Sequence, residues 1–416
     1  MNQALECKTC GSRTNFKPET VCSFCFSPLE VSYDYDRLRE ELSSGKIESR
    51  PTSMWRYHEL LPHVDGGIPD TPVGWTPLIR ARRLGKLLGM PNLYIKNDAV
   101  NFPTLSFKDR VVTVALAKAV DFGFRTVGCA STGNLANALG AQATMLDLES
   151  IILIPEDLEQ QKISASACYN TQVIKVRGTY DDVNRLCTEL TYRENMGIVN
   201  VNLRPFYSEG SKTVGFEIAE QLNWVLPDQV IVPMAGGSLI SKIGKAFGEL
   251  VKVGLVAEKT ASIFGAQAAG CSPISTLVKT GADELIPVKP DTLVKSLSIG
   301  APADGARAAA TIHRSGGWAE DVNDEETVAA IALLAETEGI FTEAAGGVTV
   351  AVTKKLLEQG KLQHDATTVL CITGNGLKTP DLVAYRTKNL PVIEPKYSSY
   401  TTFVSDGKEK AYVSTN

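Results

Sequence analysis

The sequence predicts an α/β fold built around parallel strands, with a small cysteine-containing module in front of it. Short apolar runs alternate with helical segments from residue 92 to residue 374, and this alternation is typical of parallel strands that helices cover on both faces. The chain has 416 residues, which is long enough for two domains and a sizeable core. Four cysteines in two CxxC pairs lie within the first 25 residues, before the alternation begins.

The expected elements follow this alternation in order along the chain. The segment 31–62 is charged and then punctuated by proline, which predicts a short helix and an extended linker. Strands are expected at residues 92–98, 125–131, 150–155, 171–178, 229–237, 262–268 and 367–374. Helices are expected at residues 134–146, 158–169, 180–195 and 238–251.

The composition is ordinary for a soluble enzyme, with 44% hydrophobic and 21% charged residues. A net charge of −5 and a pI of about 5.6 argue against a nucleic acid or an anionic membrane surface as the main partner. No apolar run approaches about 20 residues, the length that spans a bilayer, and the first ten residues have no secretory signal pattern. We therefore expect a cytoplasmic protein.

The four N-terminal cysteines form a candidate metal site. Cys7, Cys10, Cys22 and Cys25 make two CxxC pairs separated by eleven residues, 11 to 21. In a reducing cytosol such a set favours one tetrahedral zinc ion, as in a zinc ribbon, over free thiols or redox pairs, which stay open alternatives. Four thiolates leave no open coordination position, so the zinc is expected to be structural. The five other cysteines are expected to be small core residues.

Lys108 stands where a loop gives way to a helix, in the stretch "NFPTLSFKDRVV". A helix start carries partial positive charge from its unpaired amides, so an ammonium is unfavourable there. Either its long stem carries the charge to water while Asp109 offsets the cost, or the side chain is a reactive amine of lowered pKa.

Three strand ends are candidate anion sites, because the free amides of a following helix converge where a parallel strand stops. They are "ASTGN" at 130–134, "MAGGSLI" at 234–240 and "CITGNGLKTPD" at 371–381. Each alone could be a plain glycine turn. A dinucleotide-binding G-x-G-x-x-G is absent after these strands.

Taken together, these motifs resemble those of the threonine synthases, pyridoxal-phosphate enzymes of the tryptophan synthase β-like superfamily, which is fold type II. The resemblance rests on "SFKDR", "STGNLANA", "RGTYDDVNRLC", "EGSKTVGFEIAEQL", "PMAGGSLISKIGKAFGEL", "GIFTEAAGGVTVAV" and "ITGNGLKTPD", in that order. The N-terminal "CKTC…CSFCFSPLEVSYDYD" is similar to the subgroup that carries a zinc-ribbon-like element.

The resemblance implies two open α/β domains of the fold type II kind. We expect a zinc-ribbon-like module at 1–35 and a linker with a helical and extended segment at 36–75. The catalytic α/β region then covers 76–385, with a smaller mobile subdomain at about 110–210 inserted in it, and a C-terminal tail covers 386–416.

The resemblance also implies where the cofactor binds. Lys108 would hold pyridoxal phosphate as a Schiff base, which removes the ammonium that is unfavourable at the helix start. Asn134 would bond the phenolic oxygen of the cofactor, and Thr373 would face the pyridine nitrogen, where a hydroxyl makes a milder electron sink than a carboxylate. The cofactor phosphate would lie in a loop made of Ala235, Gly236, Gly237, Ser238 and Leu239. Glu343 is either near the ring or an ordinary exposed or capping carboxylate.

The substrate residues follow from the same resemblance. Ser131 and Thr132 would receive the substrate carboxylate. The residues implied around the substrate phosphate are Arg185, Lys212, Thr179 and Arg204. Thr179 and Arg204 stand where many relatives carry asparagine, and Arg185 as a plain helix-surface charge stays an alternative.

The implied activity is that of a carbon–oxygen lyase acting on phosphate, which converts O-phospho-L-homoserine and water to L-threonine and phosphate. It would proceed through aldimine and ketimine intermediates, by γ-elimination and then β-addition of water, with Lys108 as general base and acid. A homodimer is expected. The alternatives are another fold type II reaction, such as that of cysteate synthase or threonine dehydratase, or a cofactor-free zinc-ribbon regulatory protein.

Overall fold

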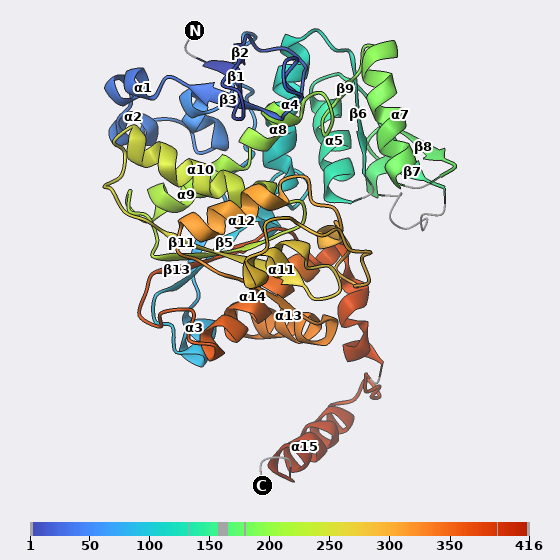
Figure 1. The fold of residues 1–416 in the computed structure, drawn as a ribbon. Helices are drawn as coiled ribbons and strands as arrows, with labels where there is room; N and C mark the ends of the chain where they lie inside the picture. Colours follow the sequence, from blue (N-terminus) through green and yellow to red (C-terminus); the bar gives the residue numbers. More distant parts are fainter. Residues whose placement is uncertain (1–2, 132, 157–164, 179, 389, 414–416) are drawn as a thin grey trace. The chain divides into compact units, whose positions relative to one another are not determined.

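The computed structural model describes residues 3–131, 133–156, 165–178, 180–388 and 390–413. By its contacts the chain divides into two units, Met1–Lys378 and Thr379–Asn416 (Figure 1). The second unit contains a 3-10 helix, η5 (Pro380–Thr387), and the helix α15 (Tyr397–Val413). All sheets of the described part of the chain lie in the first unit.

A small antiparallel sheet carries the N-terminal cysteines. Its strands are β1 (Gln3–Cys7), β2 (Arg13–Thr14) and β3 (Leu29–Tyr33), in the order β2-β1-β3. Side chains of β1 and β3 belong to the same buried cluster as the rest of the unit. The ring of Phe16 meets the ring of Phe206 edge-on at 5.1 Å. The cysteine module therefore packs on the α/β region as part of one core.

The linker segment is mostly helical, with α1 (Tyr35–Glu41), α2 (Ser44–Glu48) and the 3-10 helix η1 (Met54–Leu60). Each of them begins after a side chain that accepts a hydrogen bond from a first-turn amide, which satisfies a donor that has no partner inside the helix. These capping residues are Asp34, Ser43 and Ser53.

The larger of two open sheets has the order β12-β11-β10-β13-β5-β4. Its strands are β4 (Leu78–Arg80), β5 (Leu93–Asn97), β10 (Gln229–Pro233), β11 (Ser262–Ala268), β12 (Ala319–Val322) and β13 (Thr368–Ile372). Every pair is parallel except the edge strand β4, which runs antiparallel to β5. The central strands β10 and β13 are buried at every residue, as strands covered on both faces should be.

The smaller open sheet is parallel throughout and has the order β8-β7-β6-β9. Its strands are β6 (Thr126–Ala130), β7 (Glu149–Pro155), β8 (Gln172–Val176) and β9 (Gly197–Ile198). Two open α/β sheets and a small cysteine-bearing sheet confirm the fold class expected from the sequence. The expected domain limits stay predictions, because the described contacts divide the chain only after Lys378.

Helices connect the strands and cover the sheets. They are α3 (Arg82–Leu88), α4 (Lys108–Asp121), α5 (Asn134–Met145), α7 (Tyr180–Arg193), α8 (Arg204–Glu209), α9 (Lys212–Gln221), α10 (Ser238–Lys252), α11 (Pro273–Thr280), α12 (Gly305–Arg314), α13 (Asp324–Glu338) and α14 (Ala344–Glu358), with short 3-10 turns η2 (Asp98–Val100), η3 (Lys295–Leu297) and η4 (Gly376–Lys378). Figure 1 shows α13 and α14 packed side by side. Most of the helix expected at 158–169 lies outside the described residues. In the described part of the chain, no helix is long and apolar enough to cross a membrane.

A buried ion network fixes helix α4 to the larger sheet. Arg110 of α4 donates to Asp98 at 2.7 Å and to Glu217 at 2.8 Å, and Lys96 of β5 donates to Glu217 at 2.6 Å. Burial acts to raise the pKa of Glu217, but the charges of Arg110 and Lys96 outweigh it and lower the pKa to about 2. The network thus holds the helix that begins with Lys108.

We expect Glu217→Gln to destabilise the protein by about 3–5 kcal/mol at neutral pH, because the exchange leaves Arg110 and Lys96 buried without a full counter-charge. The pKa of Glu217 is lowered on folding, so its stabilisation is complete above the ordinary value of 4.5 and is lost as the pH falls from 4.5 towards 2. The free energies of unfolding of variant and wild type, measured in urea, should therefore converge on acidification. Glu358→Gln, whose side chain is 63% exposed, is the matched control. A constant difference between pH 7 and pH 3 would contradict the argument.

Candidate active site

Lys108 begins α4 beside the carboxyl end of β13. The amide of Phe107 donates to the carbonyl of Thr373 at 2.9 Å, and Ser106 forms an isolated antiparallel bridge with Gly374. The loop before α4 is therefore hydrogen-bonded to the residues that follow the strand. These contacts bring Lys108 and Thr373 together, as the resemblance implies, although the two residues are 265 positions apart in the sequence.

Asp109 stabilises the loop that presents Lys108. Its carboxylate accepts hydrogen bonds from the amide of Thr104 at 3.1 Å and from the hydroxyl of Thr104 at 2.8 Å. Burial raises the pKa of Asp109 to about 6, although these bonds act to lower it. The hydroxyl of Ser106 is buried and has no hydrogen-bond partner among the described residues, and such a group is usually satisfied by a ligand or water when one is present.

The ε-amine of Lys108 lies among aromatic groups. Its Nζ donates to the hydroxyl of Tyr207 at 3.1 Å. It also lies 4.8 Å from the ring centroid of Phe107 and 5.7 Å from that of Tyr207. Tyr207 was not singled out in the sequence, although it stands inside "RPFYSEGSKT", next to one of the recognised motifs.

Asn134, the first residue of α5, is held from two sides. Its Nδ2 donates to Glu343 at 2.9 Å, and its Oδ1 accepts from Lys378 at 2.7 Å. Lys378 stands inside "GNGLKTPD" and was not singled out in the sequence. The ends of β6 and β13 and the start of α14 therefore meet at this amide.

Glu343 is buried, so it is not an ordinary exposed carboxylate. Burial raises its pKa, while the hydrogen bond from Asn134 and the charges of Lys378 and Lys108 act to lower it. Burial also lowers the pKa of Lys378. A Cβ on Gly374 would lie only 2.4 Å from the Glu343 carboxyl group, so the strand end fits this carboxylate only with glycine at that position.

The glycine-rich loop joins β10 to α10. Because β10 and β13 are adjacent parallel strands, this loop and Thr373 leave the same edge of the sheet. Gly237 has φ 89°, and a Cβ there would lie 2.7 Å from the carbonyl of Asp304. No side chain caps α10, so its first amides are available to an anion. Ala235, Gly236, Gly237, Ser238 and Leu239 thus form the helix start that the resemblance assigns to a phosphate.

Two of the residues expected around the substrate lie near these elements. Ser131 directly follows β6 and is half-buried. Arg204 begins α8, and its guanidinium donates to Asp304 at 2.8 Å; the amide of Asp304 in turn donates to the carbonyl of Gly236 at 3.0 Å. Thr132 and Thr179 lie outside the described residues.

The other two expected residues are placed differently. The side chain of Arg185 is 70% exposed and pairs with Asp182 at 2.8 Å, one turn away on α7. Lys212 is fully buried, and its ammonium lies 2.7 Å from Glu209, 2.9 Å from Glu249 and 2.6 Å from the carbonyl of Leu60. Because protein groups occupy its donors, we leave Lys212 out of the substrate site. Its sequence context, "EGSKT", did not reveal this burial.

The residues present fit pyridoxal phosphate. The group needs a lysine for its aldehyde carbon and backbone amides for its phosphate. Lys108 supplies the amine, and the loop at Gly237 supplies the uncapped helix start. The buried hydroxyl of Ser106 belongs to a residue two positions before Lys108 and lacks a partner in the described part of the chain, so it is a further polar atom that a bound group could satisfy.

The four N-terminal cysteines converge on one point. The Sγ atoms of Cys7, Cys10, Cys22 and Cys25 all lie within 4.8 Å of one another. Sγ–Sγ separations are 3.4 Å for Cys7 and Cys25 and 3.7 Å for Cys10 and Cys22. A tetrahedral zinc with Zn–S bonds of about 2.3 Å needs sulfur atoms about 3.8 Å apart. The cluster could therefore hold a metal ion as it stands.

Backbone groups already favour thiolates in this cluster. The amides of Cys10 and Thr9 lower the pKa of Cys7 to about 6, and those of Cys25 and Phe24 lower the pKa of Cys22. The amide of Ser12 acts in the same direction on Cys10, but the neighbouring sulfur atoms outweigh it and raise the pKa of Cys10 to about 12. A cation would relieve this competition between like charges.

Comparisons with known proteins identify the family of this chain. The family described as "Pyridoxal-phosphate dependent enzyme" matches residues 70–374. A threonine synthase of Methanocaldococcus jannaschii is 39% identical over 389 residues, which cover 93% of this chain and 95% of the relative. A threonine synthase of Methanosarcina acetivorans is 36% identical over 383 residues, covering 91% and 93%.

A solved structure agrees on the fold. The processed form of threonine deaminase isoform 2 from Solanum lycopersicum superposes with a TM-score of 0.64 at 21% identity. The match covers 85% of this chain and 88% of that one. At this identity the likeness concerns the fold alone.

Proposed function

The chain belongs to the pyridoxal-phosphate-dependent enzymes and, within them, to the threonine synthase family, and we propose that it converts O-phospho-L-homoserine and water to L-threonine and phosphate. The observation that carries this proposal is the match to threonine synthases over more than nine-tenths of the chain. The proposal is also supported by the positions of Lys108, Asn134 and Thr373, which lie together near the carboxyl end of β13.

We assign the cofactor to the elements that meet at the larger sheet. Lys108 would hold the aldehyde carbon, and the loop from Ala235 to Leu239 would bind the phosphate through backbone amides. Asn134 would donate to the phenolic oxygen with the Nδ2 hydrogen that Glu343 leaves free. The Thr373 hydroxyl would face the ring nitrogen.

When bound, pyridoxal phosphate withdraws electrons from the amino acid and makes its Cα and Cβ protons acidic. The amine of Lys108 would take the Cα proton and give it back to the bound group, which frees the amine to take a Cβ proton; it would return this second proton in a later step. Phosphate leaves from Cγ, and water adds at Cβ. Ser131 would bind the substrate carboxylate, and Arg204 would bind the substrate phosphate with the donors that Asp304 leaves free.

Phosphate release tests this proposal directly. Purified protein loaded with pyridoxal phosphate should release phosphate from O-phospho-L-homoserine and form L-threonine in equal amount. O-phospho-L-serine, one carbon shorter, should react about 10- to 200-fold more slowly. A preference for O-phospho-L-serine would favour a cysteate synthase-like reaction, and deamination of L-threonine without phosphate chemistry would favour a dehydratase.

Arg185→Ala decides between the two interpretations of this residue. If Arg185 reaches the substrate phosphate, the loss of a charge-assisted hydrogen bond of about 1.5–3 kcal/mol should raise KM for O-phospho-L-homoserine about 10- to 100-fold. The affinity for pyridoxal phosphate should not change. The neighbouring exposed Arg193→Ala is the matched control on the same helix. Unchanged kinetics would leave Arg185 as the surface partner of Asp182.

The proposal also covers the metal ion, the oligomeric state and the location of the protein. The ion in the cysteine cluster is a structural Zn²⁺, because four thiolates at this spacing suit zinc and leave no open position. The protein is a cytoplasmic homodimer. Light scattering of the purified protein tests its oligomeric state, and metal analysis tests for zinc.

A further inference from the structure

The contact between Tyr207 and Lys108 has no place in the reaction described so far. The phenol oxygen of Tyr207 lies 3.1 Å from Nζ of Lys108, the atom that moves protons. Tyr207 is half-buried in α8, a helix of six residues between Arg204 and Glu209. No other hydrogen bond or ion pair of the Lys108 ammonium is seen within the described residues. The phenol is therefore the group that sets the position of the free amine.

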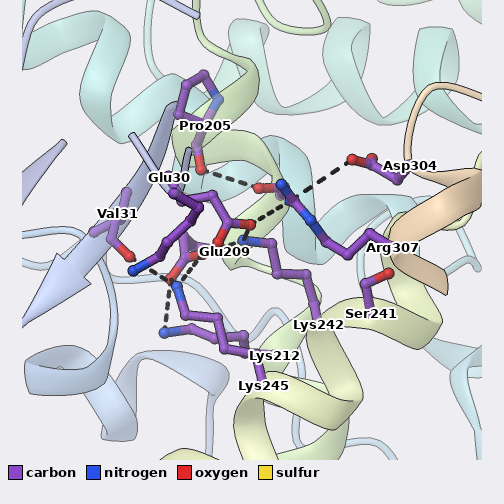
Figure 2. A network of polar contacts seen from close by, with 12 residues as sticks. Glu30, Val31, Pro205, Glu209, Lys212, Ser241, Lys242, Lys245, Asp304 and Arg307 are labelled. Carbon is purple, nitrogen blue, oxygen red and sulfur yellow. Dashed lines mark hydrogen bonds and ion pairs between the residues drawn. The ribbon is translucent and has the colours of Figure 1, made fainter. Parts of the chain in front are cut away.

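Helix α8 is held in place by a buried charge cluster that we call the Glu209 cluster. Figure 2 shows the ammonium groups of Lys212, Lys242 and Lys245 turned toward the Glu209 carboxylate. They lie 2.7, 2.5 and 2.8 Å from its oxygens. Burial acts to raise the pKa of Glu209, but the three ammonium groups outweigh it and hold the pKa well below its ordinary value.

The cysteine module supplies the other side of this cluster through β3. The hydroxyl of Tyr33 donates to Glu209 at 2.7 Å, and Lys245 donates to the carbonyl of Val31 at 2.8 Å. Glu30 accepts from Lys242 at 3.2 Å and also contacts Arg307 (Figure 2). Strand β3 therefore fixes the end of α8 two residues after Tyr207.

We propose that Tyr207 is a further catalytic residue, which holds the amine of Lys108 in place through its successive proton transfers, and that Tyr33 is a positioning residue that acts on it through Glu209. The proposal rests on the proposed function. A neutral amine accepts a hydrogen bond from the phenol O–H, and a protonated amine donates one to the phenol oxygen. The same oxygen can thus stabilise Lys108 before and after it takes a proton, with no net proton transfer to Tyr207.

Tyr207→Phe removes the hydroxyl and keeps the ring that lies against Lys108. We expect kcat for phosphate release to fall about 10- to 100-fold, the range for a lost hydrogen bond to a charged group. KM and the affinity for pyridoxal phosphate should stay within about twofold. Substrate deuterated at Cα should show a larger isotope effect on kcat in the variant, because the proton transfer becomes slower relative to other steps. Tyr192→Phe, whose side chain is 84% exposed on α7, is the matched control.

The role of Tyr33 is tested by a double-mutant cycle. Tyr33→Phe removes one of the several groups that hold the Glu209 carboxylate and should lower kcat about 3- to 10-fold. In the Tyr207→Phe background the same exchange should have no further effect on kcat, because the module would act through the lost hydroxyl. Independent effects that multiply in the double variant would show that the cluster only stabilises the fold, and would overturn the positioning role.

The outcomes separate this proposal from the proposed function. Equal kcat values for Tyr207→Phe and the Tyr192→Phe control, or a fall in kcat that disappears once cofactor occupancy is corrected for, would overturn the role of Tyr207. If the wild-type protein released no phosphate from O-phospho-L-homoserine, the proposed function would fail. The Tyr207 proposal would then be tested by the rate of covalent capture of added pyridoxal phosphate, which should fall at least threefold in Tyr207→Phe, and an unchanged rate would overturn it.

Discussion

Replacement of Lys108 by alanine is expected to abolish phosphate release from O-phospho-L-homoserine while the protein still folds and holds pyridoxal phosphate noncovalently. The amine is both the covalent attachment point and the group that moves protons, so kcat should fall by at least about 10⁴-fold, the upper range for general acid–base catalysis. The fold should survive because α4 is held by the ion pairs of Arg110 with Asp98 and Glu217, and these do not depend on the Lys108 ammonium. Fixed-time assays of phosphate release measure the loss of kcat, and unfolding in urea measures whether the fold is kept.

Borohydride treatment locates the attachment point independently of activity. In the wild-type protein it should fix pyridoxal phosphate to the peptide that contains "SFKDR". Lys354→Ala, whose side chain is 63% exposed, should behave like the wild type. Labelling of another lysine in the wild-type protein would contradict the assignment of Lys108.

The fold was largely predictable, because continuous apolar runs and helical segments alternate without long interruptions. The expected strands at 92–98 and 367–374 lie over β5 and β13, which are adjacent in the sheet. Strand order itself could not be predicted from these runs, since buried parallel strands have similar patterns and β5 pairs with a strand far along the chain. The antiparallel edge strand β4 is only three residues long and leaves no periodic signal.

The site was predictable where a residue stands on a strand end or a helix start. Lys108, Asn134 and Thr373 all hold such positions, and the fold brings them together. Tyr207 and Lys378 were missed because their partners lie 99 and 244 positions away in the chain. No local pattern encodes such a contact.

Lys212 is the opposite case, a residue that the sequence predicted for the substrate site and that the fold places elsewhere. A lysine between "EGS" and "TVGFEIAEQL" has the same local signal whether it faces a substrate or a buried carboxylate. Only the fold reveals that Glu209 and Glu249 surround it. Charge pairing inside the core therefore removed one residue from the expected phosphate site and gave it a role in holding α8.

The cysteine module contacts the groups that hold α8, although its metal is expected to be structural. Four thiolates close the coordination shell, so the metal itself should not react. However, β3 of the same module contacts Glu209 through Tyr33. Loss of the metal should therefore reach Lys108 indirectly, through α8 and Tyr207.

Replacing Cys7 and Cys10 together with serine is expected to remove bound zinc and to destabilise the protein strongly. In isolated peptides, structural sites bind zinc with a free energy of about 10–16 kcal/mol. The free energy of unfolding of a whole domain is only about 5–15 kcal/mol, so losing even a fraction of the zinc-binding energy should lower stability strongly. Metal analysis and thermal unfolding measure these effects. Cys168→Ser is the control, because Cys168 lies outside the cluster and is exposed, whereas the sequence predicted a core residue there. Protein purified without zinc, or zinc loss with unchanged unfolding, would contradict the structural site. Among molecules that stay folded and loaded with cofactor, kcat should fall as in Tyr33→Phe, and it should fall no further when Tyr207 is already phenylalanine.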